Sequence, residues 1–218
     1  NFVAGRLSER IGRKKVLVLG WLIALPIPVM IALAPNWNWI VAATVLLGVN
    51  QGLCWSMAQT SKLDLTRPNQ RGVVIGLNEF SGYVGVGLAG IITGYAATLM
   101  GPREGLLSFG LIVIGLGLVL SAFFVRDTLP WAHAEAKSAA ATAPLSTWEV
   151  FALMSWRDRR LAAISQAGLV EKFVDALVWV IYPVFLFARG LSLPEIGWVV
   201  GMYGMVWGGS QLLTGPLS

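Results

Sequence analysis

Residues 5–15, GRLSERIGRKK, place five basic side chains, one acid and two glycines directly before a long apolar run that begins at Val16. A short, strongly charged turn beside such a run is typical of a connection between two membrane helices. The glycines allow a tight turn, and the basic side chains favour the cytoplasmic face of a membrane. This stretch therefore predicts a membrane protein and the side on which the turn lies.

The rest of the composition agrees with a membrane protein. The chain is 56% hydrophobic and 12% charged, with a mean hydropathy of +0.70, whereas about a quarter of the residues of a soluble domain are charged. Six apolar runs are long enough to cross a bilayer: residues 16–34, 40–58, 73–99, 106–125, 161–188 and 196–213. The predicted fold is an all-α polytopic helical bundle embedded in a lipid bilayer.

The positive charge follows a topological pattern. Of the 16 Lys and Arg residues, all but Arg103, Lys172 and Arg189 precede the first, third or fifth run. By the positive-inside rule, residues 1–15, 59–72, 126–160 and 214–218 are expected to be cytoplasmic. The net charge of +5 therefore reflects topology and not a nucleic-acid site. With one Cys and one His, the sequence offers no disulfide, metal cluster or cofactor site, and no nucleophile–base pair that would indicate an enzyme.

The long connection between the fourth and fifth runs divides the chain into three parts. Residues 1–125 are expected to be an N-terminal bundle, 126–160 a cytoplasmic linker and 161–218 a C-terminal bundle. Within the linker, AEAKSAAATAP (134–144) is interpreted as flexible. Ser146 and Glu149 then have the spacing of a capping box and predict a short helix at the membrane surface. The letters GRLS at residues 5–8 return as GPLS at 215–218, which indicates a parallel repeat.

These features together resemble the major facilitator superfamily, whose loop between the second and third helices has the pattern G-x-L-x-D-R-x-G-R-K/R. The matching residues here are Gly5, Leu7, Arg10, Gly12, Arg13 and Lys14, with Glu9 in place of Asp. The resemblance covers the whole chain and implies that it contains the third to eighth of twelve helices. The complete protein would then consist of two six-helix bundles.

The resemblance also implies a gating role for the loop. Glu9 and Arg13 are expected to act as a latch that is made in one state of the transporter and broken in the other. Glu9 would accept hydrogen bonds from Arg13 or from exposed N–H groups of a neighbouring helix. Arg10 and Lys14 are expected mainly to set topology, with Gly5 and Gly12 allowing close approach of the helices.

Three groups of polar residues lie inside predicted spans, where such residues are expensive and often functional. The densest is Glu171, Lys172 and Asp175, which we interpret as a substrate or proton site; the alternative is a Lys172–Asp175 pair that only neutralises itself. The other candidates for substrate or proton binding are Asn50, Gln51, Asn78 and Glu79. For Asn50 and Gln51 the alternative is interhelical hydrogen bonding, and for Glu79 it is a position near the cytoplasmic side.

The expected function is secondary transport of a small solute by alternating access, coupled to protons, by a monomeric protein in a bacterial-type inner membrane. A drug/proton antiporter is an alternative, although Thr44 stands where such exporters have Arg, and Val86 and Ala89 depart from their G-P-x-x-G-G pattern. That departure leaves Ser81, Gly85 and Ala89 as an expected packing stripe. A receptor or scaffold on the same fold is the alternative from another class. The acids suit a cation and Lys172 suits an organic anion, so the solute stays open.

Overall fold

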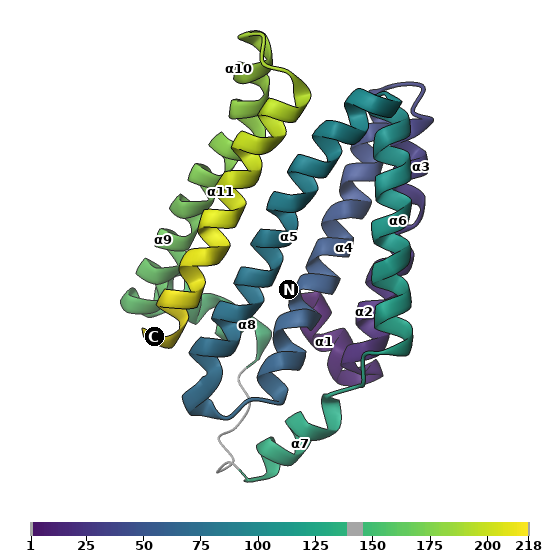
Figure 1. Cartoon of the computed structure of the whole chain (residues 1–218). Coiled ribbons are helices and arrows are strands. Elements are labelled where there is room, and N and C mark those ends of the chain that lie inside the picture. Colours follow the sequence, from purple (N-terminus) through teal and green to yellow (C-terminus); the bar gives the residue numbers. More distant parts are fainter. Residues whose placement is uncertain (1, 139–145, 218) are drawn as a thin grey trace.

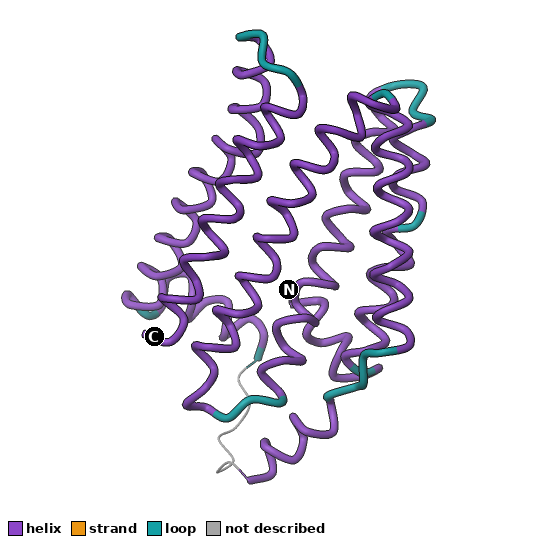
Figure 2. Tube along the Cα trace, in the orientation of Figure 1, coloured by secondary structure: helices purple, strands orange, loops and turns teal. Residues whose placement is uncertain are grey.

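The computed structural model describes residues 2–138 and 146–217, and every regular element in this part of the chain is helical (Figures 1 and 2). In chain order the α-helices are α1 (Phe2–Ile11), α2 (Arg13–Ala24), α3 (Pro26–Ala32), α4 (Trp37–Asp64), α5 (Arg71–Met100), α6 (Pro102–Phe123), α7 (Leu129–Ser138), α8 (Thr147–Ala152), α9 (Arg159–Ala176), α10 (Tyr182–Ala188) and α11 (Leu193–Thr214). Two π-helical segments, Leu153–Arg157 and Leu177–Ile181, follow α8 and α9. The all-α bundle expected from the sequence is confirmed.

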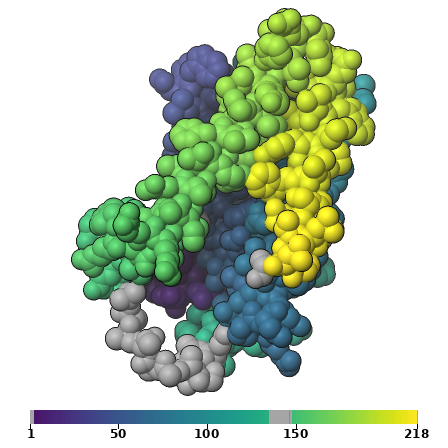
Figure 3. Space-filling model, turned by 90° about the vertical axis from the view of Figure 1, so that its left-hand side faces the viewer, coloured from purple at the N-terminus to yellow at the C-terminus, as the bar shows by residue number. Residues whose placement is uncertain are grey.

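Four helical segments are long and apolar enough to cross a membrane: Arg13–Ala32, Trp37–Asp64, Pro68–Met100 and Pro102–Phe123. The fifth and sixth expected spans are also helical, and α9–α10 runs beside α11 along one face of the molecule (Figures 1 and 3). They are not among the four, because α9 carries several charges and five glycines dilute the apolar content of α11. These two spans stay predictions.

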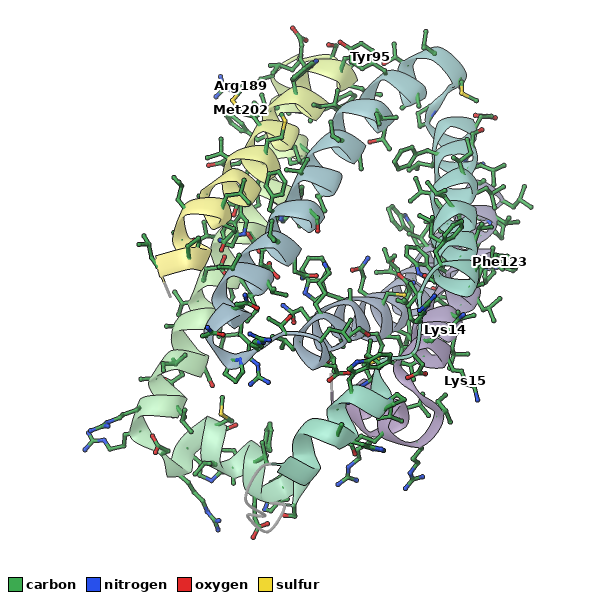
Figure 4. All side chains as sticks on the ribbon, turned by 60° about the horizontal axis from the view of Figure 1, so that its bottom comes forward. Lys14, Lys15, Tyr95, Phe123, Arg189 and Met202 are labelled. Carbon is green, nitrogen blue, oxygen red and sulfur yellow. The ribbon has the colours of Figure 1, made fainter. Side chains whose placement is uncertain are left out.

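The connections sort to the two ends of the bundle. In Figure 1 the turns after α3, α5 and α10 lie at the upper end, whereas the α1–α2 and α4–α5 turns, α7, α8 and the C-terminal end lie toward the lower end. The described parts of the segments expected to be cytoplasmic therefore gather at one end. Lys15 is exposed there and points away from the helices, as a residue that sets topology should, whereas Lys14 is half-buried (Figure 4).

Prolines and glycines explain the interruptions in the helices. The first span bends at Leu25, where Pro26 begins α3 and cannot donate a backbone hydrogen bond. The α5–α6 turn passes through Gly101 at φ 89°, a conformation that favours glycine, and Pro102 then starts α6. The π-helical segment between α9 and α10 ends at Ile181, two residues before Pro183. Proline has no backbone N–H to donate to the preceding turn, which explains an irregular helix at this point.

The expected linker is more ordered at its start than its composition suggested. Helix α7 continues to Ser138, into the Ala-rich stretch that we expected to be flexible, because alanine is the strongest helix former. The remainder of that stretch, 139–144, lies outside the described residues. The expected capping box is confirmed: the Ser146 hydroxyl accepts from the Glu149 backbone N–H, and the Glu149 carboxylate accepts from the Ser146 N–H.

Helices α5 and α11 pack backbone to backbone through glycines. A Cβ atom built on Gly197, Gly201 or Gly204 would lie 2.6, 2.7 or 2.8 Å from a carbonyl oxygen of α5. This confirms the expected close packing of α11. The prediction that α5 packs through Ser81, Gly85 and Ala89 is wrong. A Cβ atom built on Gly85 meets nothing within 4 Å.

The packing face of α5 instead contains Gly87, Gly90 and Gly94, which contact Gly201, Gly197 and the start of α11. Close backbone approach of this kind is how helices associate where the surrounding solvent is as apolar as their side chains.

Helix α6 presents a continuous apolar surface to the outside. Ile112, Leu116, Val119 and Phe123 follow one another at helical spacing and are 47–79% exposed. Phe123 points outward in Figure 4. Large apolar side chains exposed in a row are unfavourable in water and favourable in lipid, so this face indicates contact with the bilayer.

Candidate functional site

Lys172 is the centre of a group of side chains from three helices. Its Nζ atom lies 3.0 Å from Glu171 Oε2 and 2.8 Å from Asp175 Oδ2, both on α9, and donates to Tyr83 Oη of α5 at 3.4 Å. Tyr203 of α11 donates to the other oxygen of Asp175 at 2.6 Å. We call these five residues the Lys172 cluster. It joins both acids to Lys172, so it is more than the Lys172–Asp175 pair considered as the alternative.

Aromatic rings border the Lys172 cluster. Lys172 Nζ is 5.1 Å from the ring centre of Trp207 on α11, within the range of a cation–π interaction. The Trp207 ring is 5.0 Å from the ring of Tyr83 and 5.9 Å from that of Tyr203. These contacts hold the rings of α5 and α11 around the ammonium group.

The two acids of the cluster are not equivalent. The Asp175 side chain is 13% exposed, and each of its oxygens accepts a hydrogen bond. Glu171 is 36% exposed, and its Oε1 atom is buried without a hydrogen-bond partner among the described residues. Buried acceptors normally have a partner, so Glu171 is the incompletely satisfied member of the cluster.

A cavity of about 270 Å³ lies beside the cluster. Its walls come from Gln51 and Trp55 of α4, Gly82, Tyr83 and Val86 of α5, and Trp179 of the π-helical segment after α9. Tyr83 belongs to both the cavity and the Lys172 cluster. Helices from both predicted bundles thus contribute to one site.

Asn50 and Gln51 have different surroundings although they are neighbours in sequence. Asn50 is buried and its Nδ2 atom donates to the Gly20 carbonyl at 2.9 Å and to Cys54 Sγ at 3.3 Å. It therefore makes the interhelical hydrogen bond that we gave as the alternative to substrate binding. Gln51 lines the cavity.

Asn78 and Glu79 lie near the α4–α5 turn and not at the cavity. Lys62 Nζ donates to Asn78 Oδ1 at 2.7 Å, and Gln59 Nε2 donates to Glu79 Oε1 at 3.1 Å. These bonds connect α4 to α5. Among the described residues that line the cavity, neither Asn78 nor Glu79 occurs.

The charged turn at residues 5–15 forms a second polar group. Arg13 Nε lies 3.2 Å from Asp64 Oδ2 at the end of α4, and Arg13 Nη1 donates to Ser8 Oγ at 2.6 Å. Thr128, just before α7, donates to the same Asp64 oxygen at 2.7 Å. Asp127 Oδ1 accepts from the Arg13 backbone N–H at 3.3 Å. We call Ser8, Arg13, Asp64, Asp127 and Thr128 the Arg13 network.

Gly12 is required by this arrangement. Its φ is 97°, and a Cβ there would collide with the Asp127 carboxylate. Glu9 and Arg10 are exposed, and Glu9 has no hydrogen bond or ion pair among the described residues. The structure thus pairs Arg13 with Asp64 and not with Glu9, and the gating role of Glu9 stays a prediction. Gly5 contributes its carbonyl oxygen, which accepts from Ser8 Oγ at 2.7 Å.

Sequence reasoning missed Asp64, Asp127 and Thr128 as members of the network, and Tyr203 as a partner of Asp175. Asp64 and Asp127 each stand where a long apolar helix ends on the basic side. An acid among so many cations was the one available signal.

Comparison with known proteins agrees with this geometry. The family model of the Major Facilitator Superfamily matches residues 1–218. The chain belongs to this superfamily. It is therefore a multi-pass membrane transporter of the major facilitator type, which acts on small solutes from within the lipid bilayer. No curated protein and no solved structure matched the chain.

Proposed function

We propose that this major facilitator protein is a proton-coupled secondary transporter that moves its solute by alternating access. The Lys172 cluster and the adjoining cavity would bind solute and proton. The observation that carries the proposal is the position of Lys172, held by two acids of α9 while it contacts Tyr83 of α5 beside a cavity. Charged groups inside a predicted span are costly unless they are paired or hydrated, and they usually mark a functional site.

Glu171 is the proposed proton site. The Lys172 cluster contains two acids and one base, so one added proton makes it neutral. Protonation would remove the negative charge of Glu171. A proton on Oε1, which has no partner among the described residues, would turn this buried acceptor into a donor. Among the described residues, Lys172 on α9 lies against Glu171, and the Tyr203 phenol of α11 interacts with it electrostatically. Asp175, with both oxygens bonded, is the proposed structural anchor of Lys172.

The Arg13 network is the proposed gate. It connects the α1–α2 turn to the end of α4 and to the segment that leads from α6 into α7. A contact that joins helix ends in one state can bias the equilibrium between two states when it is broken in the other. We propose further that the protein is monomeric and lies in a bacterial inner membrane, with this network on the cytoplasmic side.

The experiment uses the purified full-length protein in liposomes that contain a pH-sensitive dye. Cationic, anionic and neutral small solutes are added outside, and the internal pH is followed. At least one solute should change the internal pH, and Glu171→Gln should abolish this change while labelled solute still exchanges across the membrane. Asp175→Asn should abolish both.

Proton movement that persists in Glu171→Gln would refute the assignment of the proton site. Solute binding without exchange in the unaltered protein would favour a receptor and refute the transport function.

A further inference from the structure

We infer that the cavity beside the Lys172 cluster takes a small organic cation with an aromatic or other apolar body. This inference rests on the proposed function and names the class of solute. The sequence alone left a cation and an organic anion equally open, because the cluster contains charges of both signs. The arrangement of the charges in space removes this ambiguity.

Lys172 has no hydrogen to offer an anion. An ammonium group has three N–H donors, and here Glu171, Asp175 and Tyr83 each lie within hydrogen-bond distance of Nζ. The fourth neighbour is the face of the Trp207 ring. Although the side chain is 56% exposed, an anion would have to displace one of these three partners and lie beside the two carboxylates to reach it.

The cavity walls also disfavour an anion. Among the lining residues there is no Lys, Arg or His, and the polar groups are the Gln51 amide, the Tyr83 phenol and the indole N–H groups of Trp55 and Trp179, none of which is charged. The buried indole N–H of Trp207 has no hydrogen-bond partner in the part of the chain that the structure describes, but Trp207 does not line the cavity.

Three features favour a cation. Trp55, Tyr83 and Trp179 supply aromatic rings from both predicted bundles, and the faces of such rings attract cations. The adjoining cluster contains one more acid than base, so its net charge is negative while both acids are ionised. A volume of about 270 Å³ admits a single ring with a short side chain.

Gly82 sets the shape of this cavity. A Cβ on Gly82 would lie 2.5 Å from Cη2 at the far end of the Trp55 ring. The ring therefore lies against the bare backbone of α5. A methyl group at this position would push the ring out of place, which makes Gly82 a specificity-determining residue. Gly85, on the same helix, faces open space and provides a matched control.

The test measures equilibrium binding of three probes of nearly equal shape to the purified full-length protein: phenethylammonium, phenylacetate and 2-phenylethanol. Quenching of tryptophan fluorescence and isothermal titration calorimetry give the dissociation constants. Phenethylammonium should bind at least about 10-fold more tightly than either other probe, as expected for a cation–π contact with partial desolvation. Glu171→Gln should reduce this preference to about 3-fold or less.

Gly82→Ala should weaken phenethylammonium binding by about 5- to 10-fold, whereas Gly85→Ala should leave it unchanged. Equal or tighter binding of phenylacetate overturns the inference, as does equal binding of 2-phenylethanol or no binding of any probe. The inference and the proposed function fail separately. An anion that binds and drives proton movement overturns the inference alone, whereas the absence of any solute-linked proton movement overturns the proposed function.

Discussion

The Arg13–Asp64 pair should be a strongly coupled contact at the end of the bundle. Both side chains are almost buried, 9% and 10% exposed, and their charged atoms are 3.2 Å apart. At an effective dielectric constant of about 20, this distance corresponds to roughly 5 kcal/mol of Coulomb attraction, part of which offsets desolvation. Removal of one partner leaves a buried charge, and we expect either Arg13→Ala or Asp64→Ala to cost about 3 kcal/mol.

The double variant should cost much less than the two single variants together. It leaves no orphan charge, so we expect a coupling energy of about 2 kcal/mol in the double-mutant cycle. The assay is thermal unfolding of the detergent-purified protein followed by circular dichroism. Each single substitution should lower Tm by roughly 6–12 °C for a chain of this size.

Glu9→Ala is the matched control for this cycle. It removes an exposed acid from the same turn, and Tm should change little because surface substitutions usually alter stability by less than about 0.5 kcal/mol. Transport measured on the same variant tests the gating prediction: lost transport with unchanged Tm means that Glu9 finds its partner in another state. A coupling energy below about 0.5 kcal/mol for Arg13 and Asp64 would refute the reasoning.

Two further predictions concern helix packing and capping. Gly201→Ala should separate α5 from α11 and lower Tm, because the added Cβ would lie 2.7 Å from the Gly87 carbonyl oxygen, whereas Gly209→Ala, on the same helix but facing open space, should not; equal Tm values for the two variants would contradict this. Hydrogen bonds from Ser146 hold the pKa of Glu149 below its ordinary value, so the cap stabilises α8 above the ordinary pKa and loses this effect as the pH falls through the lowered one. Backbone carbon chemical shifts of residues 147–152 should therefore lose helical character on acidification, and shifts that stay constant across this range would argue against the cap.

The sequence was informative where a property depends on near neighbours. The helices, the Ser146 capping box, the Glu171–Lys172–Asp175 group and the glycines of α11 all follow from residues within a few positions of one another. Partners far along the chain were not predictable in this way. Arg13 and Asp64 are 51 residues apart, and Asp175 and Tyr203 are 28 apart.

Helix rotation explains the packing error on α5. Each residue turns an α-helix by about 100°, so a shift of two positions, from Gly85 to Gly87, moves a side chain about 200° around the axis. The sequence of α5 has small residues on both of these faces. Only the glycines of α11 show which face is used, because their backbone lies against Gly87, Gly90 and Gly94.

This packing bears directly on the proposed binding site, because Tyr83 takes part in both. The Tyr83 carbonyl oxygen lies against Gly204 of α11, where a Cβ would be 2.8 Å away, and its phenol reaches Lys172 of α9 and lines the cavity. A shift of α11 along α5 must therefore move Tyr203 and Trp207 relative to Tyr83, and with them the ring contacts around Lys172. The helix interface and the charge cluster would therefore change together in the alternating-access cycle that we propose.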